Sequence, residues 1–83
     1  MEQISEVELV VGNLGEIQED TTVPRNVRLQ IQNVMNSLRA DTEISIKISK
    51  ALNQLDEVSS DVNLQSYTRT QIWNAMSALE KLH

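Results

Sequence analysis

The sequence contains no cysteine and no phenylalanine, and its 83 residues include only two glycines, one proline, one tryptophan and one tyrosine. Without cysteine there is neither a disulfide framework nor a thiolate metal site, which favours a reducing compartment. No apolar run approaches the roughly 18–20 residues that a membrane span requires, and the start Met1-Glu2-Gln3 lacks the cationic residues of a signal peptide. We therefore expect a soluble, cytoplasmic protein that does not associate with membranes.

Side chains that perform catalysis are also scarce. The one histidine, His83, is the last residue, and the sequence has no glycine-rich phosphate loop, HExxH motif or serine elbow. We expect no catalytic residues, no metal and no cofactor, and therefore a protein that is not an enzyme. The net charge of −5 also differs from the strongly basic balance of general nucleic-acid binders.

Four segments carry apolar residues at steps of three and four, which is the pattern of amphipathic helices. The four stripes are Ile4, Val7, Val10, Val11, Leu14 and Ile17; Val27, Ile31, Val34, Met35 and Leu38; Ile44, Ile48, Ala51, Leu52, Leu55 and Val58; and Leu64, Thr68, Ile72, Ala75, Met76, Leu79 and Leu82. They predict an all-α, four-helix domain that spans residues 1–83. A chain of this size has a small core and no room for a second domain.

Local signals indicate where the helices begin. The second helix is expected to start near Val23 or Pro24, because proline suits the first turn of a helix and disfavours helix in the residue before it. Asp41 or Thr42 is the expected cap of the third helix, and Asn63 is the expected cap of the fourth.

One segment gives a mixed signal. The run from Ile44 to Ile48 alternates between apolar and polar residues like a strand, but the apolar period beyond Ile48 is helical, and a lone strand would have no partner. We predict helix here, with Ile46 on a second face.

Sliding the chain against itself by 41 residues reveals an internal correspondence. Ten pairs are identical where average composition predicts about two or three: Glu2/Glu43, Leu14/Leu55, Glu16/Glu57, Asp20/Asp61, Arg28/Arg69, Gln30/Gln71, Ile31/Ile72, Asn33/Asn74, Met35/Met76 and Leu38/Leu79. The pattern predicts two tandem helical hairpins, at about residues 2–40 and 43–81. They form either a HEAT-like repeat of stacked hairpins or an up-down bundle.

Charge alternates along the chain. The net charges of residues 1–24, 25–40, 41–61 and 62–83 are −6, +3, −3 and +1. If the first and third helices form one layer and the second and fourth form the other, the molecule has an acidic and a basic face, which would steer a partner. The competing interpretation is that neighbouring helices neutralise each other.

Several acidic residues near the ends of the first and third helices share a helix face at a spacing of four or five residues. They are Glu16 with Asp20, and Asp56 or Glu57 with Asp61. Such carboxylates can bind a divalent cation, but the glycine and ligand spacing of an EF-hand are missing. Loop capping, or ion pairing with Arg28 and Arg69, is the alternative.

Gly12 and Gly15 lie inside the first helix, where each costs about 1 kcal/mol relative to alanine. They either let another helix approach closely, within the domain or in a dimer, or they mark a frayed or kinked helix. Trp73 lies four residues after Arg69 at the edge of its stripe. It either covers the edge of the core, stacked against the guanidinium, or anchors an interface.

Residues Leu14 to Arg28 together with Arg69 to Asn74 resemble the archaeal Uncharacterised Protein Family 0147. The resemblance extends through nearly the whole chain and implies an archaeal, cytoplasmic, all-helical small protein without an assigned activity. No functional residues can be carried over. Lys47 stands where that family has arginine, and the proline that precedes its fourth helix is Gln65 or a neighbour here.

These observations favour a non-enzymatic helical protein-interaction module, which is expected to self-associate because two stacked hairpins leave an apolar end uncovered. The candidate partner-binding residues are Arg25, Arg28, Arg69 and Trp73. The alternative is an RNA- or ribosome-associated accessory protein, in which these residues and Tyr67 on the second and fourth helices form a small RNA-binding patch.

Overall fold

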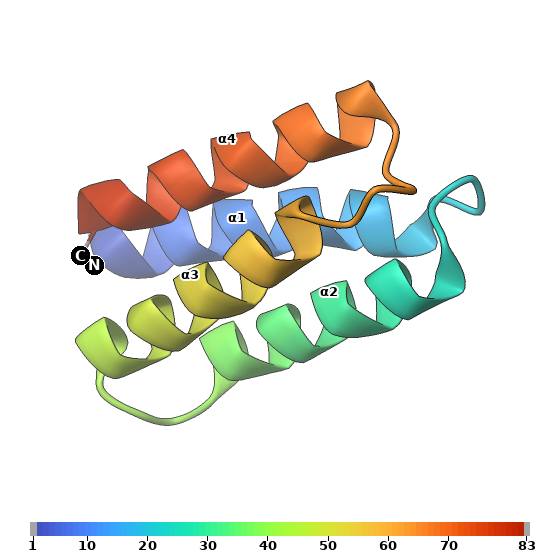
Figure 1. The fold of residues 1–83 in the computed structure, drawn as a ribbon. Helices are drawn as coiled ribbons and strands as arrows, with labels where there is room; N and C mark the ends of the chain where they lie inside the picture. The colour runs from blue at the N-terminus through green and yellow to red at the C-terminus, as the bar shows by residue number, and fades with distance from the viewer. Residues whose placement is uncertain (1, 83) are drawn as a thin grey trace.

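The computed structural model describes residues 2–82, with side chains from Glu6 to Leu82, so the side chain of Ile4 and all of His83 lie outside the described part. The four helices are α1 (Glu2–Glu19), α2 (Arg25–Arg39), α3 (Ile44–Ser59) and α4 (Ser66–Leu82). They are joined by short loops and run alternately in opposite directions (Figure 1). The prediction of an all-α, four-helix architecture is confirmed.

The helix starts agree only partly with the sequence signals. Helix α2 follows Pro24, as expected, and the strand-like run beginning at Ile44 is helical, with Ile46 exposed. The two predicted caps are wrong. Helix α3 is preceded by Glu43 and has no side-chain cap hydrogen bond, and α4 begins at Ser66, three residues after Asn63. The Asn63 N–H instead donates a hydrogen bond to Asp61 Oδ1 within the loop, at 2.8 Å.

The helices form a closed ring. Helix α1 packs against α2 and α4, and α3 packs against the same two helices (Figure 1). Within residues 2–82, α1 has no close backbone contact with α3 across the ring, and neither has α2 with α4. The domain is therefore an up-down bundle in which every neighbouring pair is antiparallel.

This arrangement corrects the expected layers. Stacked hairpins would place α1 beside α3 and α2 beside α4, but each of these pairs lies diagonally across the bundle. The acidic helices α1 and α3 therefore occupy opposite corners, and each is flanked by the arginine-bearing helices. The predicted acidic and basic faces are wrong, and the contacts agree with the competing interpretation, in which neighbouring helices of unlike charge neutralise each other.

All four apolar stripes contribute to one core. Leu14, Ile31, Leu55 and Leu79, one from each helix, are almost completely buried. The identical pair Ile31 and Ile72 is equally buried, since neither residue is exposed to solvent. The core therefore lies along the axis of the ring, and each helix turns one stripe inward.

The two glycines of α1 are not required by the packing of this chain. A Cβ atom added at Gly12 would have no atom within 4 Å outside its own helix backbone, and one at Gly15 would lie 3.6 Å from Met35 Cε, an ordinary contact. Neither residue has a positive φ angle. Helix packing within the domain therefore does not explain why these positions lack a side chain.

We expect Gly12→Ala to raise the free energy of unfolding by about 0.5–1 kcal/mol, because alanine restricts the unfolded chain and suits a helix better than glycine. Gly15→Ala should also stabilise, because it adds a contact with Met35. Urea unfolding followed by circular dichroism measures both. A loss of stability in either variant would show that a Cβ atom does not fit at that position without a clash.

Candidate functional site

The loops at one end of the bundle are built alike. The loop between α1 and α2 and the loop between α3 and α4 lie at the same end (Figure 1), and we call this the twin-loop end. The Asp20 N–H donates to the Ile17 carbonyl at 3.1 Å, and the Asp61 N–H donates to the Val58 carbonyl at the same distance. The positions differ by 41 residues in each case, so the match in sequence corresponds to a match in backbone contacts.

The two aspartates turn these loops through their side chains. Asp20 Oδ1 accepts hydrogen bonds from the Thr22 N–H at 2.9 Å and from the Thr22 hydroxyl at 2.7 Å. Asp61 Oδ1 accepts the Asn63 N–H at 2.8 Å. The hydroxyl bond of Thr22, then its backbone bond, and then the charge of Arg28 lower the pKa of the Asp20 carboxyl. These contacts agree with the interpretation of the two carboxylates as loop caps.

The paired arginines brace the same loops. Arg28 Nε donates to the Val23 carbonyl at 3.1 Å. Arg69 donates twice, from Nε to the Ser59 carbonyl at 3.1 Å and from a terminal guanidinium nitrogen to the Asp61 carbonyl at 2.8 Å. Both side chains are half-buried. The guanidinium groups therefore satisfy carbonyl groups at the end of α3 and in the two loops that have no helical partner.

The other two candidate residues are exposed. Arg25 begins α2, and Trp73 on α4 leaves 53% of its surface exposed. Asn26 lies beside Arg25, and its side-chain amide donates to Asp61 Oδ2 at 3.3 Å, which joins the first turn of α2 to the loop between α3 and α4. The structure therefore places Arg25, Arg28 and Arg69 at the twin-loop end, where Arg28 and Arg69 are occupied by the backbone.

The opposite end of the bundle contains a groove. Helix α2 ends at Arg39 and the chain turns into α3 at Ile44, which leaves a gap between these residues and the first turns of α1. The gap has a volume of about 520 Å³ and is lined by Val7, Glu8, Val11, Gly12, Leu38, Arg39, Ile44 and Lys47. We call it the α1–α3 groove.

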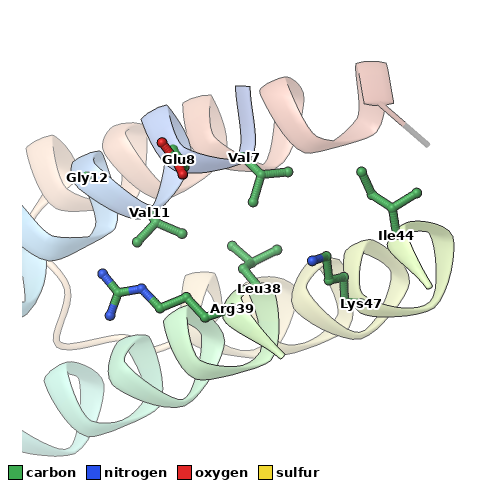
Figure 2. Close-up of a pocket in the computed structure, with 8 residues that line it drawn as sticks. All are labelled: Val7, Glu8, Val11, Gly12, Leu38, Arg39, Ile44 and Lys47. Atoms are coloured by element: carbon green, nitrogen blue, oxygen red, sulfur yellow. The ribbon is translucent and has the colours of Figure 1, made fainter. Parts of the chain in front are cut away.

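The α1–α3 groove has an apolar floor and a charged rim. Figure 2 shows Val7 and Val11 pointing from α1 toward Leu38, while the Arg39 and Lys47 side chains lie on the same side of the gap as Leu38. Glu8 supplies a carboxylate on the α1 side. Gly12 leaves a stretch of α1 backbone without a side chain at the rim. Val7, Val11 and Leu38 are buried members of the core, and Ile44 is the half-buried apolar residue of the lining. The groove thus combines a small apolar surface, two cations, one carboxylate and accessible backbone.

Residue spacing does not predict this groove. It predicts that Val7, Val11 and Leu38 belong to core stripes, and it gives Arg39 no role in a site. The available signal was Gly12, which is unfavourable in a helix and in this structure faces open space. The gap itself depends on where α2 ends relative to α1, which residue spacing does not specify.

The large exposed apolar side chains are distributed over the four helices and one loop. Six are large and exposed, and each has a polar residue 41 positions away: Leu9/Lys50, Leu29/Thr70, Ile46/Ser5, Val62/Thr21, Tyr67/Asn26 and Trp73/Gln32. Scattered apolar side chains of this kind are ordinary on protein surfaces. The groove is therefore the stronger candidate site.

Two further features are absent from the described residues, 2–82. No group of three or more histidine, aspartate or glutamate side chains is placed to hold a metal ion in this part of the chain. None of the four helices there has the combination of length and apolar character that a membrane crossing requires.

We expect Arg69→Ala to lower the free energy of unfolding by about 1.5–3 kcal/mol, because it removes two charged hydrogen bonds to loop carbonyls. Arg28→Ala removes one such bond and should cost less. Arg69→Lys should recover only part of the loss, since an ammonium group cannot reproduce the planar guanidinium geometry. Chemical unfolding of the three variants gives the order of their free energies of unfolding. Equal stability of wild type and Arg69→Ala would contradict a stabilising role for the Arg69 hydrogen bonds.

The pKa of Asp20 leads to a test at low pH. A carboxyl whose pKa is lower in the folded state stabilises the fold above its unfolded pKa, and this contribution disappears as the pH falls through the folded value. We expect Thr22→Ala to raise the pKa of Asp20 and to reduce the acid-induced loss of stability below about pH 4. Carboxyl-carbon NMR titration checks the first effect and urea unfolding at several pH values checks the second. An unchanged Asp20 titration would contradict the assignment.

The chain is similar to proteins of one family. Residues 1–82 match the family described as Uncharacterised protein family (UPF0147). A UPF0147 protein from Archaeoglobus fulgidus is 38% identical over 76 residues, which cover 92% of this chain and 87% of that protein. A UPF0147 protein from Methanocaldococcus jannaschii is 41% identical over 70 residues, covering 83% and 75% respectively.

A solved structure has the same fold. The crystal structure of the unknown function protein MMP1188 is similar to this bundle with a TM-score of 0.89 and 39% sequence identity, over 94% of this chain and 90% of that one. The family match extends over all four helices, and the relatives in these comparisons come from archaea. The chain belongs to the uncharacterised protein family UPF0147.

Proposed function

We propose that this protein is a non-enzymatic helical interaction module, which binds a segment of a partner protein in the α1–α3 groove. The observation that carries the proposal is the apolar groove of about 520 Å³ with Gly12 at its rim. That volume is within the usual range of binding sites and can hold a few side chains. An apolar floor with a polar rim is the usual anatomy of a protein interface.

Gly12 supports the proposal through its energetic disadvantage. A glycine inside a helix costs about 1 kcal/mol relative to alanine, and the open space around Gly12 gives no reason for it within the domain. A partner backbone that crosses α1 at this point would give such a reason, because close approach is possible only where no Cβ intervenes.

Self-association was expected through an uncovered apolar end of two stacked hairpins. Because α1 packs against α4 and closes the ring, this end does not exist. If the chain binds a second copy of itself, the groove is the site we expect that copy to occupy. Sedimentation that depends on protein concentration, and is abolished by Gly12→Leu, is the result that would identify it.

The proposed RNA- or ribosome-associated role has less support from the geometry. Arg28 and Arg69 donate hydrogen bonds to loop carbonyls, which leaves Arg25 as the exposed arginine of the predicted patch. An RNA probe whose migration shifts at low salt, and no longer shifts with Arg25→Glu, would favour this role over the groove.

The groove is tested by selecting random short peptides from a displayed library on the wild-type protein. We expect the selected peptides to bind Gly12→Ala more weakly than wild type, because a Cβ hinders the close approach of a partner backbone. We expect a loss of at least about tenfold in affinity on Gly12→Leu, because leucine also fills the rim of the groove. Both substitutions improve helix propensity, and urea unfolding of Gly12→Leu shows whether the variant is as stable as wild type, so that a loss of binding is separated from a loss of folding.

The site of binding is located separately by amide chemical-shift changes, which we expect at Val7, Val11 and Leu38. If no peptide is selected, or if the selected peptides bind Gly12→Leu as tightly as wild type, the groove is not the binding site.

A further inference from the structure

The α1–α3 groove brings cations and apolar surface together in a chain that is acidic overall. Its lining includes Arg39, Lys47 and one acid, Glu8, whereas the whole chain has a net charge of −5. Arg39 is in the last turn of α2 and Lys47 is in the first turn of α3, so the end of one helix and the start of the next place both cations on one wall.

Both cations retain donors for a ligand. Arg39 is exposed. Lys47 is half-buried, and its Nζ donates to the Ala40 carbonyl at 3.4 Å, which is a long bond. An ammonium group has three donors and a guanidinium has five, so neither group is saturated by these contacts. A carboxylate near the rim can therefore form charge-assisted hydrogen bonds with both residues.

These features are found in one half of the chain and are not demanded by the fold. Leu38 and its counterpart Leu79, 41 residues later, are identical and buried. In contrast, the counterpart of Arg39 is Glu80, which reverses the charge, and the counterpart of Gly12 is Asn53. The bundle thus accepts a different charge and a side chain at the equivalent positions. The fold therefore does not demand this combination of residues at the groove.

We infer that the partner segment is acidic, with one or two apolar side chains on the floor formed by Val7, Val11 and Leu38, and with aspartate or glutamate carboxylates paired with Arg39 and Lys47. This inference rests on the proposed function, because it specifies the partner of the same groove. It also specifies how the segment lies across the groove. The carboxylates of the partner face the α2–α3 wall, which carries Arg39 and Lys47, and its apolar side chains lie between that wall and α1.

The floor of the groove favours a protein segment over a nucleic acid. The described lining contains valine, leucine and isoleucine but no aromatic side chain on which a base could stack. Aliphatic surface beside two cations instead matches a peptide that alternates apolar and acidic residues.

The test compares peptide selections on four forms of the folded protein: wild type, Gly12→Leu, Arg39→Glu/Lys47→Glu, and the control Lys50→Glu/Lys81→Glu. The control makes the same change in net charge at two exposed lysines outside the groove. We expect wild type and the control to select peptides in which aspartate or glutamate neighbours apolar residues. The groove double variant should select neutral or basic peptides.

The selected acidic peptides are then synthesised and their affinities measured by calorimetry. We expect about a tenfold or greater loss on Arg39→Glu/Lys47→Glu and a change of no more than about twofold on the control. Raising the salt concentration should weaken binding to wild type, because exposed ion pairs are screened.

The outcomes separate the two proposals. Peptides that depend on Gly12 but show no excess of acidic residues, or that bind the groove double variant and wild type equally, would overturn the acidic partner and leave the interaction module standing. Failure to select any peptide that depends on Gly12 would overturn both. A dimer of the wild-type protein that Gly12→Leu dissociates would make a second copy the occupant and would overturn the proposed foreign segment.

Discussion

The need to bury four apolar stripes at once determines the arrangement of this protein. A small chain has few core residues, and two hairpins packed side by side as layers would leave parts of the stripes facing water. When α1 packs against α4, the ring closes and every stripe faces the same axis. The placement of charge follows from the ring, because each acidic helix then has two arginine-bearing neighbours and no acidic one beside it.

The twin-loop end shows how polar residues fix the ring. Asp20 and Asp61 turn the chain after α1 and α3, and Arg28 and Arg69 satisfy carbonyls of the same loops. The Asn26 amide connects the first turn of α2 to the loop between α3 and α4. Buried apolar contacts would tolerate some sliding of one hairpin along the other. Directional hydrogen bonds at one end limit that freedom, while the opposite end, where α2 stops early, keeps the gap that forms the groove.

Residue spacing predicts the local structure of this chain well, because a helix repeats every 3.6 residues and a buried stripe such as Val27 to Leu38 follows that period. The arrangement of helices around the core is less predictable, since an inward stripe on α1 fits either α3 or α4 as a neighbour. The predicted caps at Asp41 or Thr42 and at Asn63 are wrong because a polar residue before a helix can also turn a loop, as Asp61 does by accepting the Asn63 backbone N–H. The groove could not be predicted because it depends on distances between helix ends, and its lining valines also belong to the core.

The position of the groove affects how this protein is best studied. The start of α1, the end of α4 and the α1–α3 groove all lie at one end of a bundle about 35 Å long (Figure 1). A fusion tag or surface attachment at either terminus would therefore sit beside the groove and obstruct its opening. The loop that carries Val62, whose side chain is 90% exposed, lies at the far end. Immobilisation or labelling through this loop leaves the groove facing solution.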